Sequence, residues 1–334
     1  KQNKYNESFQ YLRKLDGLEN IHKSYSLKYL YSLINSGNFY QAFVYSKKLE
    51  KQKESSFESN LIIGIYYLKK SKFNESKKYF LKAKQKKPRL ILDNYIIDTL
   101  SNWSSVNSSN LEKSKFILNQ MDNRFDNLKK IQKVFLNCFF KDGKTEVEFE
   151  ALINNEDTDF SRYNYFFVKY LDRIGKGSKA EVTLKNSLKK FPRNLLLNQH
   201  KLDRKNSKNN SYFNCEKVED VVAEILYITA NALSSQSIYS LSNFYLNLAK
   251  YLNKNFHAFD TLLAENFYNI NNFAKAKEIY KSLIVYGSAF EWYSNKQIAR
   301  ILIQENNKES ALSLLSRSYD KLNYKGIYEG FDYA

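Results

Sequence analysis

Few residues in this sequence have the types and spacing that catalysis or metal binding requires. The three histidines, His22, His200 and His257, lie far apart, and none belongs to an HExxH motif or a closely spaced pair. Cys138 and Cys215 lack CxxC spacing and a nearby histidine, so the sequence indicates neither a zinc site nor a disulfide framework. We therefore predict no metal site and expect both cysteines to be small buried apolar residues.

Two other short patterns resemble parts of active sites. The segment GKGSKA, which begins at Gly175, resembles a phosphate-binding loop, but it lacks the GxxxxGK[ST] spacing and lies between two expected helices. Glu219 and Asp220 form an acidic pair in the first turn of an expected helix, where carboxylates stabilise the helix dipole. That structural role outweighs general acid–base catalysis. We predict no catalytic residue, no cofactor and no enzymatic activity.

The composition describes the framework that must position any functional side chain. The 334 residues include only 2 Pro and 9 Gly, which favours long uninterrupted helices over a β-rich or loop-rich fold. A hydrophobic fraction of 43% and a charged fraction of 26% indicate a folded chain. No apolar run approaches the roughly 18 residues that span a bilayer. We expect no transmembrane segment and a soluble protein, for which we favour the cytoplasm over the periplasm or a membrane surface.

The formal net charge of +18 has two interpretations. It predicts attraction to acidic proteins, nucleic acid or anionic membrane surfaces. Alternatively, a genome biased toward lysine codons produces the same excess without any functional role. The sequence leaves both interpretations open.

Small residues recur with a period close to 34 residues. Ser8, Ala42 and Ser76 are spaced 34 residues apart, each early in the second helix of an expected helix pair. The series continues downstream at Ser114, Glu148, Ala180, Ser242, Ala276 and Ala311. A second series, twelve residues before members of the first, consists of Gly64, Ala230, Ala264 and Ala299. Small side chains at both positions allow paired helices to pack closely, whereas Glu148 predicts a displaced or splayed repeat.

Turn residues separate the paired helices at regular places. Glycine and asparagine tolerate the left-handed backbone conformation that ends a helix. They occur before expected second helices at Gly37, Gly143, Gly175, Asn271 and Asn306. Pro88 and Pro192 lie where second helices are expected to end, a position at which proline costs little.

One segment, from Asn60 to Pro88, carries the complete repeat pattern. Its small, aromatic and proline positions are Gly64, Tyr67, Phe73, Ser76, Phe80, Ala83 and Pro88. This pattern resembles the tetratricopeptide repeat (TPR) family. The resemblance implies an all-α fold, a right-handed α-solenoid of tandem TPR-like helix–turn–helix repeats with about eight or nine helix pairs. The segments LLAENFY and FEWYSNKQIARIL are also similar to TPR proteins of bacteria, especially alphaproteobacteria.

The register divides the chain into three parts. We predict an N-terminal TPR-like array over residues 1–192, an irregular helix with a polar loop over 193–217, and a C-terminal array over 218–334. The loop region is either a joint between subdomains or a degenerate repeat. We favour one continuous superhelix.

The two ends of the sequence depart from the repeat. Ser8 and Leu12 match a second helix whose first helix is absent, so we expect the sequence to begin midway through a repeat. Residues 5–16 then form a solitary cap, or natural sequence before them is missing. The tyrosine-rich segment from Asn323 either packs across the last repeat or extends freely.

A stack of such repeats has a concave surface lined by the first helix of each pair, where a peptide or a helix can bind. We therefore predict a scaffold or adaptor that binds a protein or peptide, which the aromatic and cationic lining suggests is acidic and partly apolar. The predicted groove contacts are Tyr31, Ile65, Tyr165, Lys169, Tyr227, Asn231, Thr261, Glu265, Lys296 and Arg300.

Nucleic-acid binding is the alternative, less favoured function. Basic residues concentrate in one repeat and the turn after it, where they are able to follow phosphates. They are Lys69, Lys70, Lys72, Lys77, Lys78, Lys82, Lys84, Lys86, Lys87 and Arg89. Most of them are expected to face solvent on the outer helix, as ordinary solvated lysines do. The sequence leaves the partner, the pathway and the oligomeric state open.

Overall fold

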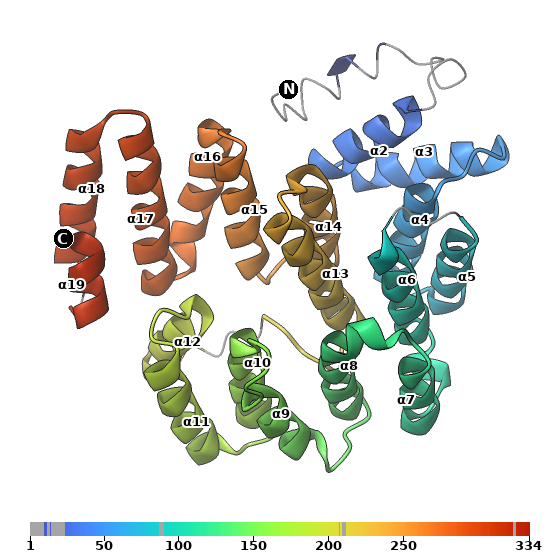
Figure 1. The fold of residues 1–334 in the computed structure, drawn as a ribbon, viewed down its shortest axis with the longest axis horizontal. Coiled ribbons are helices and arrows are strands. Elements are labelled where there is room, and N and C mark those ends of the chain that lie inside the picture. The colour runs from blue at the N-terminus through green and yellow to red at the C-terminus, as the bar shows by residue number, and fades with distance from the viewer. Residues whose placement is uncertain are drawn as a thin grey trace. The chain divides into compact units, whose positions relative to one another are not determined.

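The computed structural model describes residues 10–11, 14, 24–86, 90–206, 208, 212–322 and 325–334. Every regular element in these ranges is a helix, and no strand occurs among them (Figure 1). Most successive helices form antiparallel pairs joined by short turns. The predicted fold class, an all-α fold of TPR-like helix–turn–helix repeats, is confirmed.

Contacts within the chain group it into two compact units, each built from two separate stretches of sequence. Unit 1 comprises Lys1–Thr145 and Cys215–Asn255, and unit 2 comprises Glu146–Asn214 and Phe256–Ala334. This grouping differs from the three sequential parts expected from the register, because helices distant in sequence pack together within each unit. The domain boundaries at residues 193–217 and the continuous superhelix stay predictions.

In unit 1, a helix pair from late in the sequence packs against helices from its beginning. Figure 1 shows α13 and α14 beside the early helices, and α13 contacts α6 while α14 contacts α2 and α4. The α-helices of this unit are α2 (Tyr25–Asn35), α3 (Phe39–Lys51), α4 (Phe57–Lys69), α5 (Phe73–Lys84), α6 (Ile91–Trp103), α7 (Leu111–Asn119), α8 (Asp126–Phe139), α13 (Val218–Ser235) and α14 (Tyr239–Leu252). Short 3-10 helices are η2 (Val106–Ser108) and η3 (Asn123–Phe125).

Unit 2 is organised in the same way, since α12 packs against α10, α11 and the distant α17. Its helices are α9 (Thr145–Ile153), α10 (Ser161–Arg173), α11 (Gly177–Lys190), α12 (Leu195–Lys205), α15 (Ala258–Asn269), α16 (Phe273–Leu283), η4 (Ile284–Tyr286), α17 (Ser288–Gln304), α18 (Lys308–Asp320) and α19 (Ile327–Tyr333). The segment that begins at Asn323 therefore packs, as α19, against α18; residues 323–324 lie outside the described part.

The predicted small residues lie at the crossings of paired helices. All that the structure describes, apart from Glu148, are at most 2% exposed: Ala42, Ser76, Ser114, Ala180, Ser242, Ala276 and Ala311. Ser76 Oγ donates a hydrogen bond to the Gly64 carbonyl at 2.9 Å, and Ser242 Oγ donates to the Ala230 carbonyl at 2.7 Å. These bonds join the two series of small residues across each pair. Ser8 and Leu12 lie outside the described residues.

Gly64 shows how closely the two helices of a pair approach each other where they cross. A Cβ atom on Gly64 would overlap the Phe80 ring, whose Cζ would lie 3.1 Å away.

In α9, Thr145 and Phe149 are buried while Glu148 is half-buried. The face of α9 that meets the core is therefore displaced from the predicted position, since a carboxylate is costlier to bury than the threonine and phenylalanine that face the core.

Four of the five predicted turn residues have the expected left-handed conformation. Gly143 does not, and at its turn the left-handed residue is Lys141, with φ of 55°. Gly37 and Gly175 have φ of 77° and 78°, and Asn271 and Asn306 have φ of 59° and 61°. Pro192 follows α11, whereas Pro88 lies outside the described residues.

A disulfide joins Cys138 on α8 to Cys215, which lies just before α13 in unit 1. The two Cα atoms are 5.9 Å apart, and the residues are 1% and 4% exposed. The prediction of two unpaired cysteines was wrong. The 77 residues that separate them in sequence give no sign that the fold brings α8 and the start of α13 together.

Candidate functional site

The predicted groove residues divide between the two units and differ in exposure. Ile65, Tyr165 and Lys169 are buried, and Asn231 is exposed. The others are half-buried: Tyr31, Tyr227, Thr261, Glu265, Lys296 and Arg300. The exposure of each residue depends on which other helices pack against the helix that carries it.

In unit 1, the pair α13–α14 lies against the first helices that carry Tyr31 and Ile65. The Tyr31 ring centroid is 4.8 Å from that of Phe244 on α14, and Ile65 on α4 is 1% exposed. Tyr227 and Asn231 lie on α13 itself. The predicted groove residues of α2 and α4 therefore pack against the chain's own helices.

In unit 2, the predicted residues on α10 also pack inside the unit. The Tyr165 ring lies 5.9 Å from the His200 ring and 6.1 Å from the Phe256 ring, measured between centroids. Burial lowers the pKa of Lys169, although the nearby Asp172 and Asp203 carboxylates act in the opposite direction. These two residues belong to the packed interior of unit 2.

The first helices α15 and α17 keep a row of partly exposed charged residues. Glu265 on α15 accepts hydrogen bonds from Arg300 Nη2 on α17, at 2.8 Å, and from Tyr280 Oη on α16, at 3.0 Å. The Arg300 guanidinium also lies over the Tyr268 ring, 3.6 Å from its centroid. Two of the predicted groove residues, Glu265 and Arg300, are thus brought together.

The environment of this row fixes its charges. Burial acts to lower the pKa of Arg300, but the hydrogen bond from Arg300 to Glu265 outweighs it, so the pKa of Arg300 is raised. Burial, together with nearby negative charge, raises the pKa of Tyr280, which keeps its hydroxyl protonated and able to donate to Glu265. The row therefore presents a permanent guanidinium cation that one carboxylate already binds.

Lys296 lies on α17, four residues before Arg300, and binds a second carboxylate of the chain. Lys296 Nζ forms an ion pair with Asp332 Oδ2 on α19, and Arg193 Nη2 binds Asp332 Oδ1 at 2.9 Å. The Lys296 ammonium also lies 5.7 Å from the centroid of the Trp292 ring. Both predicted cations of α17 are therefore in contact with carboxylates and aromatic rings, which is the chemistry of acidic-peptide recognition.

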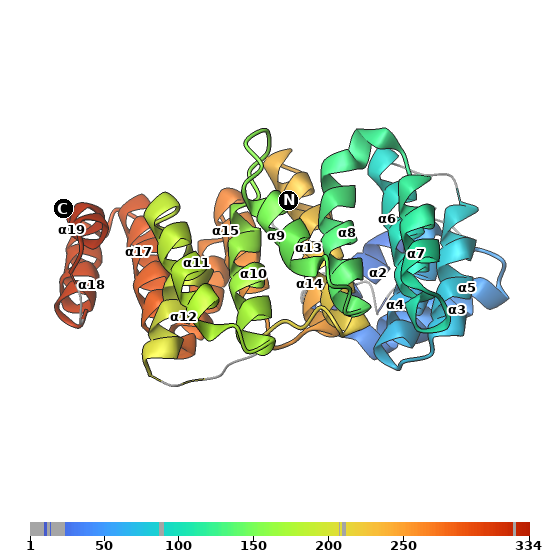
Figure 2. The ribbon, with the colours of Figure 1, turned by 90° about the horizontal axis from the view of Figure 1, so that it is seen from below.

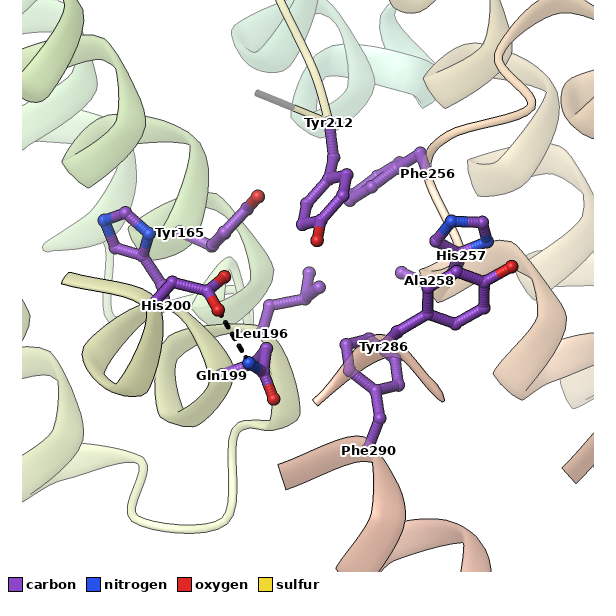
Figure 3. Close-up of a pocket in the computed structure, with 11 residues that line it drawn as sticks. Tyr165, Leu196, Gln199, His200, Tyr212, Phe256, His257, Ala258, Tyr286 and Phe290 are labelled. Atoms are coloured by element: carbon purple, nitrogen blue, oxygen red, sulfur yellow. Dashed lines mark hydrogen bonds between the residues drawn. The ribbon is translucent and has the colours of Figure 1, made fainter. Parts of the chain in front are cut away.

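A small aromatic pocket lies elsewhere in unit 2. Figure 3 shows Tyr165, Gln199 and His200 on one side, and His257 and Tyr286, whose rings are stacked, on the other. The space between the side chains measures about 10 Å³, which is on the scale of one water molecule. A pocket of this size is too small for an organic substrate.

The titratable groups beside this pocket connect α10 to α12. His200 Nε2 lies 2.9 Å from Asp172 Oδ2, and Arg204 Nη1 binds Asp172 Oδ1. Burial acts to raise the pKa of Asp172, but the bonds from His200 and Arg204 outweigh it and lower the pKa. Gln199 Nε2 donates to Asp203 Oδ1 at 2.8 Å (Figure 3). The bonds to Asp172 hold α12 against α10, whereas the Gln199–Asp203 bond lies within α12, and we assign all three a structural role.

Two searches for other kinds of site gave negative results within the described ranges. None of the helices there is long and apolar enough to cross a membrane. No group of three or more histidine, cysteine, aspartate or glutamate side chains among the described residues is arranged to hold a metal ion.

The basic cluster of unit 1 is partly neutralised by its own surroundings. Lys69 Nζ donates to the Leu252 carbonyl at 2.6 Å, Lys84 binds Asp98 at 2.6 Å, and Lys82 binds Glu50. The exposed members are Lys70, Lys72, Lys77, Lys78 and Lys84, while Lys87 and Arg89 lie outside the described part. Three of the predicted cations thus already have partners.

Sequence reasoning missed Tyr268 on α15, and it also missed the pair formed beside Lys296 by Arg193, before α12, and Asp332, on α19. Tyr268 follows Glu265 by three residues, which is one helical turn, so its position over Arg300 had a local signal. Arg193 and Asp332 had none, because 139 residues separate them and only the packing of unit 2 brings them together.

No protein-family model matches the chain, and a search of curated proteins found no match. Among solved structures, the chain is similar to human IFIT1, solved as a dimer with m7Gppp-AAAA, at 15% identity and a TM-score of 0.31, covering 98% of this chain and 76% of that one. It is similar to the P58(IPK) TPR domain at 12% identity and a TM-score of 0.29, covering 99% and 92%. A chain of Naa15/Naa10 bound to HypK-THB gives 13% identity and a TM-score of 0.25, covering 98% and 62%. These TM-scores are low, and we draw no functional conclusion from them.

Proposed function

We propose that the chain is a non-catalytic scaffold or adaptor that binds an acidic peptide or helix of another protein along α15 and α17 of unit 2. The observation that carries this proposal is the pair of cations, Lys296 and Arg300, each of which contacts an aromatic ring and a carboxylate. Side-chain exposures of 24% and 40% leave both cations within reach of a ligand. A partner carboxylate would replace Glu265 or Asp332, or share their cations.

The experiment is affinity capture with the wild-type chain and with Arg300→Gln, at low and high salt, followed by identification of the bound proteins. Arg317→Gln is the matched control, because Arg317 is an exposed arginine on α18 of the same unit. We expect proteins that the wild type and the control retain, and that Arg300→Gln loses. Identical sets from all three chains, or nucleic acid alone, would contradict the proposal.

Nucleic-acid binding by unit 1 is the second candidate. The exposed Lys70, Lys72, Lys77 and Lys78 favour it, together with Tyr40, which is 61% exposed and offers a ring for stacking. The internal partners of Lys69, Lys82 and Lys84 count against it. Binding of a labelled oligonucleotide that falls steeply with salt would favour this function, and no binding at low salt would remove it.

The disulfide bears on the compartment, for which the sequence favoured the cytoplasm. Disulfides persist in oxidising compartments and are rare in cytosolic proteins. The chain has 2 cysteines, and the structure pairs them in unit 1. We therefore propose an oxidising compartment. Thiol alkylation under denaturing conditions, which expose these buried residues, should leave Cys138 and Cys215 unmodified in protein taken directly from its cells, and modification of both would favour the cytoplasm. The bacterial source stays a prediction.

A further inference from the structure

The short helix α19 (Ile327–Tyr333) has the chemistry of the ligand that the proposed function requires. Its sequence, IYEGFDY, combines two carboxylates with three aromatic rings. Figures 1 and 2 both show α19 beside α18 in unit 2, and the two helices are in contact. An acidic, aromatic segment of the chain itself thus lies on the unit that carries Lys296.

One carboxylate of α19 is held by two cations. Asp332 binds Arg193, which precedes α12, at 2.9 Å and forms an ion pair with Lys296 on α17. The Asp332 side chain is 16% exposed and that of Lys296 is 24% exposed, so this ion pair is partly shielded from water, whereas the Arg193 side chain is 54% exposed. Asp332 therefore anchors the C-terminal half of α19 to residues far away in the sequence.

Aromatic contacts surround this anchor. The Tyr333 ring stacks on the Tyr319 ring of α18, with centroids 4.7 Å apart and planes 6° apart. The Arg193 guanidinium lies 5.5 Å from the Tyr328 ring centroid and 5.6 Å from that of Phe331. The residues that contact α19 therefore bind both its negative charge and its aromatic rings.

The rest of α19 is held weakly. Ile327 is 88% exposed, Phe331 is 75% exposed and Tyr328 is 46% exposed, and no residue of the helix is buried. A helix of seven residues has little stability of its own in water. Its position therefore depends on Asp332 and Tyr333, and a competing segment with the same two anchors can replace it.

We propose that Arg193, Lys296 and Tyr319 form a docking site, the acidic-segment site, for a short segment of a partner protein in which an aspartate is flanked by aromatic residues. In this structure α19 occupies the site in cis and competes with that partner. The inference rests on the proposed function, and it adds the partner's chemistry and the regulation of the surface. A tethered competitor acts at an effective concentration of about 1 mM, so the partner binds well only when α19 leaves.

The experiment uses the full chain and a fluorescent synthetic peptide, KGIYEGFDYA, which has the sequence of residues 325–334. Asp332→Lys is the release variant, because a lysine there meets Arg193 and Lys296. Glu309→Lys, at an exposed carboxylate on α18, is the control with the same change in charge. Fluorescence anisotropy should show that the release variant binds the peptide about ten-fold or more tightly than the wild type and the control do.

Two further measurements test whether the peptide takes the place of α19. A peptide with lysine in place of its aspartate should lose binding to the release variant, and the wild-type peptide should bind more weakly when Arg193→Gln, which removes the cation without giving the introduced lysine a carboxylate partner, is added to that variant. Equal peptide binding by the wild type and the release variant, or binding that does not depend on the peptide aspartate, would overturn the inference. If Arg300→Gln still loses captured proteins in that case, the proposed function stands without the acidic-segment site.

Discussion

Glu50 in unit 1 and Glu265 in unit 2 have the same kinds of partner but lie in different layers of their units. Each carboxylate accepts a hydrogen bond from a tyrosine hydroxyl, Tyr79 at 2.9 Å and Tyr280 at 3.0 Å, and each binds a cation. Glu50 joins the second helices α3 and α5, whereas Glu265 joins Arg300 to the row on the first helices α15 and α17. Whether an ion pair belongs to the proposed binding surface therefore depends on whether it lies on the first or the second helices, more than on its residue types.

The first helices of the two units differ in the same sense. In unit 1, α13 and α14 pack against α2, α4 and α6, and a disulfide holds the start of α13 to α8. In unit 2, α12 packs against α17, and the short α19 is held near Lys296 by Asp332. In both units distant helices thus cover part of this face, but in unit 2 the charged Lys296 and Arg300 stay partly exposed, with side-chain exposures of 24% and 40%. The following predictions test that difference.

The largest effect is expected from removal of the disulfide. Replacing Cys138 and Cys215 by alanine should lower the free energy of unfolding by about 2–5 kcal/mol, because the bond closes a long loop in the unfolded chain. Denaturant titration measures the loss. Hydrogen exchange should show faster exchange in α8 and α13 of unit 1 than in the wild type, with α15 to α18 of unit 2 little changed. An equal increase in both units would contradict the separate stabilisation of unit 1.

A smaller effect is expected from overfilling one helix crossing in unit 2. Ala276 is 0% exposed, so Ala276→Leu should cost about 1–3 kcal/mol of unfolding free energy, measured by denaturant titration. Ala274→Leu, at an exposed position of the same helix, is the control and should be nearly neutral. Equal stability of the two variants would mean that the register of this repeat is misassigned.

The smallest effect is expected from the ion pairs around Glu50, which join the second helices α3 and α5 of unit 1. Burial acts to raise the pKa of Glu50, but hydrogen bonds from Lys47, Lys82 and Tyr79 outweigh it and lower the pKa from 4.5 to about 2. The stability that ionised Glu50 contributes is therefore complete above pH 4.5 and is lost as the pH falls toward 2.

Glu50→Gln should lower the unfolding free energy at pH 7 by about 1 kcal/mol or less, because the cluster is partly exposed. The difference from the wild type should shrink between pH 4.5 and 2. Glu75→Gln, at an exposed carboxylate on α5, provides the control. A difference that stays constant over this range would show that ionisation of Glu50 does not cause it.

The sequence alone determined the repeat and much of its detailed packing. Small residues such as Ala42, Ser76 and Ala276 are spaced by the geometry of a helix pair, and that geometry is local, so their burial follows from the period. The left-handed turns at Gly37 and Asn271 follow from local backbone preferences in the same way. Of the row in unit 2, Glu265, Lys296 and Arg300 were placed on first helices by the register alone.

Only the tertiary structure decided which first helices are covered by helices that lie far away in the sequence. The pairing of Tyr31 with Phe244, of Cys138 with Cys215 and of Arg193 with Asp332 each joins residues that lie far apart in the chain. Side-chain types and periodicity carry little information about such contacts, because any amphipathic helix pair presents a similar face to several possible neighbours. The packing of each whole unit therefore decides which neighbour each helix has, and which first helices carry the proposed binding surface.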